Sequence, residues 1–153
     1  MQPVLGAWAD EHTLPRFAAF IKAAAVETMP ITDAVKRLHS RPRPFVANPA
    51  LHPVLKKSDS PAYPSGHATG AALHAALLAA ILPEYAAAFA GQAELVRLSR
   101  LYAGVHFPTD VAAGRRLGEA IAREMLRSPA TQRAIGPIRS EILAALAAHQ
   151  KAA

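Results

Sequence analysis

Residues 61–82 read PAYPSGHATGAALHAALLAAIL, and this stretch indicates how the chain folds. A turn-forming segment ends at Pro64, and a run rich in alanine and leucine extends from about Gly66 to Ile81 before Pro83 stops it. Alanine and leucine strongly favour helix. Because the run is too short to cross a bilayer, the sequence predicts a helix buried in the core of the protein.

The composition agrees with a helical protein. The chain has 153 residues, of which 52% are apolar and only 6% are aromatic. Abundant alanine and leucine with few β-branched residues favour packed helices over sheets, and the length suits one domain with its own core. We therefore predict an all-α, compact helical bundle. It forms a single domain over residues 1–153, and its motif-bearing core runs from about 32 to 127.

The spacing of apolar residues predicts further helices, at residues 14–28, 32–40, 92–103, 106–128 and 138–149. Prolines and caps suggest their limits. Pro30 would end the first helix, and Thr32 would cap the second. Pro108 suits the first turn of the helix that starts near residue 106, and Pro129 would end that helix.

Residues 45–63 show neither helical nor strand periodicity and predict a long loop. Loops of this length in a small domain are uncommon and are often functional. Gly114 and Gly118, in contrast, are better explained by close packing of one helix on another than by binding.

Three clusters of polar residues lie at helix ends or loop junctions. The first consists of Lys36 and, six residues later, the pair Arg43-Pro44. Arg43 stands between two prolines, which fix its backbone in an extended path. A fixed guanidinium suits bidentate binding of phosphate, and Lys36 would add a point charge. Taken alone, both side chains are more typical of a solvated surface.

The second cluster is Pro64-Ser65-Gly66-His67, at the start of the buried helix. The first amides of a helix have no partner within it, so they form an anion site together with the helix dipole. Ser65 would add a hydroxyl group and His67 a titratable one. Helix capping by Ser65 with a solvated His67 explains the same residues about equally well.

The third cluster combines Ser99-Arg100 with His106 and Asp110. His106 and Asp110 are four residues apart across the start of a helix, so the carboxylate can hold one ring nitrogen protonated. The other nitrogen then becomes a directed lone pair, suited to a nucleophile or a base. The alternative is that Asp110 caps the helix and His106 stabilises the turn.

Together, Lys-x6-Arg-Pro, Pro-Ser-Gly-His and Ser-Arg-x5-His-x3-Asp resemble the three-part signature of one superfamily. It contains the bacterial class A non-specific acid phosphatases, the type 2 phosphatidic acid phosphatases and the vanadium-dependent haloperoxidases. The resemblance extends from Lys36 to about Gly118 and fills every position of the signature. The 31 residues between His67 and Ser99 are near the short end for this superfamily.

The resemblance implies a phosphomonoesterase of broad specificity that is independent of metals, has an acid optimum and forms a phosphohistidine. It implies no cofactor, and it implies that vanadate inhibits by mimicking the transition state. His106 would be the nucleophile, Asp110 would orient it, and His67 would act as the acid and then as the base. The residues implied to hold the phosphate are Lys36, Arg43, Ser65, Gly66 and Arg100. For Ser99 we expect packing or a hydrogen bond beside Arg100.

Two related activities stay open as alternatives. One is a peripheral phosphatase of lipid phosphates or pyrophosphates, and the other is a haloperoxidase with vanadate as its cofactor. A module that only binds anions is disfavoured because His67, His106 and Asp110 are all present. The chain has no cysteine, so thiolate metal sites and disulfides are excluded.

The expected partner is a small phosphorylated substrate, in line with a net charge of +6. We expect no nucleic acid partner. Peripheral contact with a membrane and a homo-oligomer both stay open. The sequence shows no signal peptide and no transmembrane segment, although the resemblance implies the periplasm. A chain complete as given would be expected in the cytoplasm.

Overall fold

A computed structural model of the chain describes residues 2–152, and over that range it contains helices and no strand. The long helices are α2 (Pro15–His39), α4 (Gly66–Ile81), α5 (Ala86–Tyr102), α6 (Pro108–Arg127) and α7 (Pro129–Ala152). The short ones are α1 (Gln2–Leu5), α3 (Pro44–Ala47) and the 3-10 turn η1 (Pro83–Tyr85). The predicted all-α class is confirmed.

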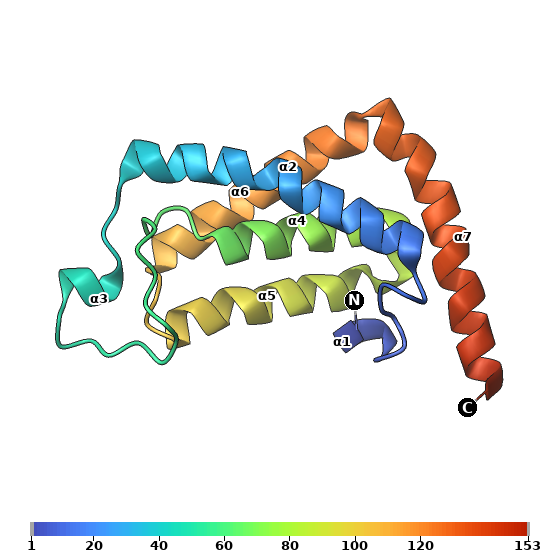
Figure 1. Cartoon of the computed structure of the whole chain (residues 1–153), viewed down its shortest axis with the longest axis horizontal. Helices are drawn as coiled ribbons and strands as arrows, with labels where there is room; N and C mark the ends of the chain where they lie inside the picture. Colours follow the sequence, from blue (N-terminus) through green and yellow to red (C-terminus); the bar gives the residue numbers. More distant parts are fainter. Residues whose placement is uncertain (1, 153) are drawn as a thin grey trace.

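Helix α4 is the centre of the bundle. In Figure 1 it lies between α2 and α5, and α6 crosses it. Its leucines and its final residue, Ile81, are buried, and Leu73, Leu77 and Ile81 are completely inaccessible to solvent. A helix that is apolar on most of its faces has to be covered by neighbours on most of its faces. The sequence of α4 therefore explains its central place, and its predicted bounds are confirmed.

Helices α4 and α6 pack almost backbone to backbone. A Cβ atom added to Gly114 would lie 2.5 Å from the carbonyl oxygen of Ser65, and one added to Gly118 would collide with the carbonyl oxygen of Thr69. Only glycine allows so close an approach. The packing role predicted for both glycines is confirmed.

The predicted break at Pro30 is wrong, because residues 15–39 form one continuous helix with Pro30 inside it. Thr32 is not a cap either: its hydroxyl donates to the carbonyl of Thr28 within α2. Pro30 is exposed, so the carbonyl of Val26 that it leaves without a partner can be hydrated. Burial of the opposite face of α2, including Phe17 and Ala24, keeps the helix continuous.

The starts of two other helices also differ from the predictions. Helix α5 begins at Ala86 instead of residue 92, after the turn η1. Helix α7 begins at Pro129 instead of residue 138, so Pro129 starts a helix as well as following one. Pro137 inside α7 is exposed, like Pro30 in α2. The predicted loop contains the short helix α3 and otherwise has no regular structure.

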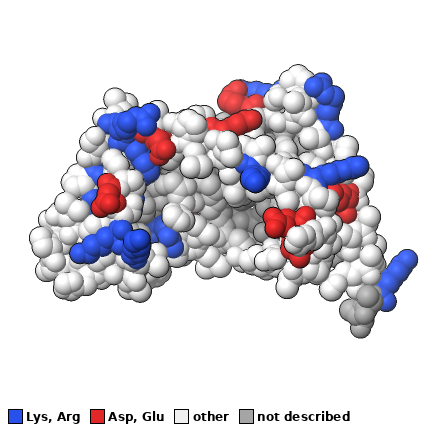
Figure 2. Space-filling view, viewed as in Figure 1, with Lys and Arg blue, Asp and Glu red and all other residues white. Residues whose placement is uncertain are grey.

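The two ends of the bundle differ in content. Helix α3, the long loop, the end of α2 and the starts of α4 and α6 lie together at one end, and α7 stands at the other (Figure 1). On the face shown in Figure 2, Lys and Arg atoms lie at both ends of the molecule, with Asp and Glu atoms among them. Among the described residues, no helix has both the length and the apolarity needed to cross a bilayer.

Candidate active site

The three polar clusters meet at the α3 end of the bundle, and hydrogen bonds join each to the next. The Nζ of Lys36 donates to the carbonyl of Pro64 at 2.8 Å, which links the first cluster to the second. The amide of Ser65 donates to the carbonyl of Asp110 at 3.0 Å, which links the second to the third. A contact of 2.9 Å between Arg43 Nη1 and His106 Nε2 closes the circle.

The contact with Arg43 fixes the tautomer of His106. A guanidinium has only N–H donors and no acceptor, so Nε2 of His106 must accept and carry a lone pair. The proton of the neutral ring is therefore on Nδ1, which lies 3.4 Å from Oδ2 of Asp110. That separation is long for a hydrogen bond, and Nδ1 is buried with no closer partner. The ring is oriented as a nucleophile or base requires.

Burial sets the charge state of His106. The side chain is 5% exposed, and its pKa lies below the ordinary value mainly because the ring is desolvated. Arg43 lowers the pKa further, while the Asp110 carboxylate raises it. The balance keeps the ring neutral near neutral pH.

Asp110 is fully buried and is held from three sides. Its Oδ2 accepts from the amide of Phe107 at 2.8 Å, and its Oδ1 accepts from Arg41 Nη1 at 2.8 Å. Burial alone would raise the pKa of Asp110, but contacts with His106, Phe107 and Arg41 outweigh it and hold the pKa below its ordinary value. The two roles considered for Asp110, helix cap and partner of His106, are thus compatible, because the carboxylate caps α6 and faces His106 at once.

Arg41 is a member of this site that the sequence reasoning missed. Besides the pair with Asp110, it donates to the hydroxyl of Thr109 at 2.6 Å and lies 4.2 Å from the ring centre of Phe107. Its place in the sequence held a signal. Arg41 and Arg43 alternate with Pro42 and Pro44, and side chains two residues apart in an extended segment point the same way.

Arg43 is 8% exposed and is fixed by more than its flanking prolines. Its Nε donates to the carbonyl of Ser60 at 2.8 Å, its Nη2 to the hydroxyl of Ser60 at 2.9 Å, and its Nη1 also to the carbonyl of Val105 at 2.9 Å. Ser60, in the long loop, is a second residue that the sequence did not reveal. The loop therefore supports the site through both the backbone and the side chain of Ser60.

Lys36 is buried at 7% exposure and donates to the carbonyls of Pro61 and Pro64. An ammonium group has three N–H donors, so one is left for a ligand. Burial, and then the neighbouring Arg43, lower the pKa of Lys36 to about 8. The side chain is charged at neutral pH but close to losing its proton.

Ser65 occupies the cap position that begins α4. Its oxygen accepts from the amide of Ala68 at 3.4 Å, and its carbonyl accepts from Thr69. The amides of Gly66 and His67 precede these and have no acceptor within the helix. The start of α4 thus offers free N–H groups, as the sequence predicts.

His67 and Arg100 complete the set, and neither side chain has a partner in the other clusters. His67 is exposed, yet its pKa lies below the ordinary value, first through partial desolvation and then through the positive charge of Arg100. Arg100 is half-buried and donates from Nε to the hydroxyl of Ser99 at 3.1 Å. This is the hydrogen bond expected of Ser99.

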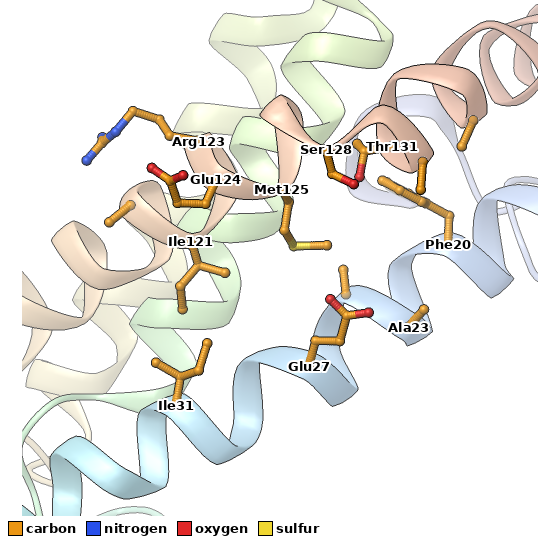
Figure 3. A pocket seen from close by; sticks show the side chains of 14 residues that line it. Phe20, Ala23, Glu27, Ile31, Ile121, Arg123, Glu124, Met125, Ser128 and Thr131 are labelled. Carbon is orange, nitrogen blue, oxygen red and sulfur yellow. The ribbon is translucent and has the colours of Figure 1, made fainter.

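A large hollow lies away from these residues. About 640 Å³ in volume, it is bounded by α2, α6 and the start of α7 (Figure 3). Figure 3 shows Ile31, Ile121, Met125 and the carboxylate of Glu27 around it, with Glu124 farther out. None of the three clusters contributes to its lining.

The sequence of this chain is similar to those of known proteins. The family model described as the PAP2 superfamily matches residues 17–134. The non-specific acid phosphatase of Salmonella typhimurium is 32% identical over 117 residues, which is 72% of this chain and 46% of that protein. The acid phosphatase of Zymomonas mobilis is 32% identical over 111 residues, 69% of this chain and 41% of that protein. The chain thus spans less than half the length of these relatives.

Proposed function

Because the chain belongs to the PAP2 superfamily, we propose that it hydrolyses phosphomonoesters through a phosphohistidine formed at His106. The observation that carries the proposal is the placement of the His106 ring between Arg43, which faces Nε2, and the carboxylate of Asp110, which faces Nδ1. This placement leaves a lone pair on Nε2. The names of the relatives, non-specific acid phosphatase and acid phosphatase, support the same chemistry.

In the first step, the Nε2 lone pair forms a bond to phosphorus, and the bond from phosphorus to the ester oxygen breaks. His67, in its protonated form, gives its proton to that oxygen as the alcohol leaves. A phosphoryl oxygen takes the place of Nε2 as acceptor for Arg43. Asp110 stabilises the positive charge that the ring of His106 acquires.

In the second step, His67 is neutral and takes a proton from a water molecule as that water bonds to phosphorus. The bond between phosphorus and Nε2 breaks, inorganic phosphate leaves, and His106 returns to its neutral tautomer. Because His67 is exposed, water can reach it.

The phosphate cradle consists of fixed cations and amides. Lys36, Arg43 and Arg100 neutralise charge on the phosphoryl oxygens, and Ser65 with the amide of Gly66 donates hydrogen bonds. These groups supply the positive charge that a metal ion supplies elsewhere, so we propose a metal-independent reaction. They contact phosphate alone, which supports broad specificity. Full activity in EDTA is expected, and activity that needs an added divalent ion would contradict this part.

The lowered pKa values of both histidines support an acid optimum. His67 must be protonated to act as the acid, and its pKa lies below the ordinary value, so kcat/KM is expected to fall as the pH rises through that pKa. His106 must be neutral, and its lowered pKa allows this at acid pH. A profile of kcat/KM that peaks above neutral pH would contradict the two roles.

Vanadate tests the geometry without turnover. A five-coordinate vanadate bonded to Nε2 of His106 would mimic the transition state, and such mimics bind about a hundredfold or more tighter than substrates. Inhibition no stronger than that by inorganic phosphate would contradict a histidine nucleophile. Oxidation of bromide by the vanadate-loaded protein would favour the haloperoxidase alternative.

The decisive experiment is rapid-quench labelling with an aryl phosphate that carries radioactive phosphorus. His106→Ala should form no acid-labile phosphoenzyme. His67→Ala should still form the phosphoenzyme, because the aryl leaving group needs no proton. The variant should hydrolyse the phosphoenzyme about a hundredfold to ten-thousandfold more slowly than the wild type. His52→Ala, an exposed loop histidine, is the matched control and should behave as the wild type. Label retained in His106→Ala would overturn the assignment.

A further inference from the structure

A second hollow adjoins the phosphate cradle. This groove of about 340 Å³ runs between α2 and α4. Its lining includes Lys36 and Gly66 from the proposed cradle and His67, the proposed acid. The remainder follows the two helices away from the cradle, to Ala25 on α2 and His74 on α4. In the view of Figure 2 the molecule is hollowed between its upper and lower layers, where Figure 1 shows α4 between α2 and α5.

The walls of the groove are mostly apolar. Met29 and Leu73 contribute their side chains. Thr28 and Thr32 direct their hydroxyl groups to carbonyls of their own helix, and Thr32 turns its methyl group toward Gly66. Asp33 also lines the groove, close enough to Lys36 to act on its charge. Beyond this carboxylate the walls offer few of the hydrogen-bond partners that a sugar needs. An aromatic or alkyl group matches them better.

Two features of α4 open the groove and mark its far end. Gly70 lies one turn after His67, and a Cβ atom added there would meet nothing within 4 Å. His74 lies one turn further and lines the far end of the groove; its Nε2 is buried out of reach of a ligand, which leaves Nδ1 as the ring nitrogen that can face the groove. Burial lowers the pKa of His74, so the ring is neutral near neutral pH. From His67 to His74 the helix rises by about 10 Å, roughly the length of two fused rings.

We propose that this groove binds the alcohol part of the phosphomonoester, and that within a broad specificity it favours aromatic or similarly apolar alcohols with a hydrogen-bonding group at the far end, opposite His74. The proposal rests on the proposed function. His67 is the residue that would give its proton to the ester oxygen, and it lines the mouth of the groove. The alcohol that carries this oxygen therefore starts at the mouth and has the groove directly beside it.

The test uses phosphonates, which bind without being hydrolysed, in titration calorimetry on the whole chain. Naphthylmethylphosphonate should bind the wild type about tenfold to hundredfold tighter than methylphosphonate, because the ring system is buried in the groove. Gly70→Leu should abolish most of this advantage and leave methylphosphonate unchanged. Gly91→Leu is the matched control, since it is also a helical glycine with open space around it, on α5.

The outcomes separate the groove from the cradle. Equal affinity for both phosphonates, or equal loss in Gly70→Leu and Gly91→Leu, would overturn the groove while the phosphatase proposal stands. Absence of binding by either phosphonate would overturn both. If Gly70→Leu does not fold, Met29→Gln on the opposite wall should weaken naphthylmethylphosphonate alone, by about threefold, and no loss would overturn the groove.

The role of His74 has its own readout. A hydroxyl on the far ring of naphthylmethylphosphonate should improve binding by about threefold to tenfold in the wild type, and this gain should vanish in His74→Leu. The unsubstituted ligand should bind His74→Leu as well as before. A gain that persists in His74→Leu would remove His74 from the proposal.

Discussion

The hollow between α2, α6 and α7 and the groove between α2 and α4 lie on two sides of the same helix. The first is nearly twice as large, about 640 Å³ against 340 Å³, and its lining includes Glu27, Arg123 and Glu124. The second is bordered by Lys36 and His67, whose pKa values are both lowered. Perturbed ionisable groups beside a hollow are a better guide to chemistry than its volume.

The largest effect is expected at the carboxylate behind His106. Asp110→Asn should lower kcat/KM by about a hundredfold to ten-thousandfold, because an amide can donate to Nδ1 and so favour the tautomer with the proton on Nε2. That tautomer has no lone pair for phosphorus, and its N–H would face Arg43. Glu27→Gln, an acid of the larger hollow, is the control and should change kcat/KM by less than about twofold. Similar losses in both variants would contradict the distinction between the two hollows.

A smaller effect is expected from the charge of Lys36. Its amine is charged below pH 8 and neutral above it, since the pKa is lowered to about 8. Phosphate remains a dianion between pH 8 and 10, and both histidines are already neutral there. The affinity for phosphate should therefore fall by up to about tenfold per pH unit above 8. Lys36→Arg should remove this dependence, because arginine keeps its proton. A flat profile in the wild type would show that Lys36 does not titrate in this range.

The smallest effect concerns Arg41, which acts through Asp110. The side chain of Arg41 is 36% exposed, so its pair with the buried carboxylate is partly screened. We expect Arg41→Gln to lower kcat by about threefold to tenfold and to leave the inhibition constant of phosphate unchanged. Arg41→Lys should restore part of kcat. Arg123→Gln, beside the larger hollow, is the matched control. Loss of phosphate binding in Arg41→Gln would indicate direct contact with the ligand instead.

The sequence predicted the helical class and the meeting of the three clusters, but it predicted helix limits less well. Pro30 illustrates why. Whether a proline ends a helix depends on whether the carbonyl it leaves free can reach water, and that depends on which face of α2 is buried. Burial is a property of the whole fold. The bounds of α4 needed no such knowledge, because Ser65 caps one end and Pro83 follows the other.

The candidate site likewise contains contacts that local sequence predicts and contacts that depend on the whole fold. His106 and Asp110 are neighbours along the chain, so their meeting could be predicted from spacing alone. Arg41 reaches Asp110 across 69 positions, and Ser60 reaches Arg43 across 17. Neither contact has a local signature beyond the alternation of arginine and proline. Residues that hold other residues in place are recognised only once the chain has folded.

The close approach at Gly114 and Gly118 has a consequence for how this protein can change. The carbonyl of Ser65 lies against Gly114, and the amide of Ser65 bonds to Asp110 one turn earlier on α6. The spacing between Ser65 and Asp110 is thus set by main chain against main chain. Side chains of the proposed groove can be exchanged without altering that spacing, whereas a single methyl group at position 114 would alter it. Under the proposed function, substrate preference can therefore change over generations while the reaction is kept.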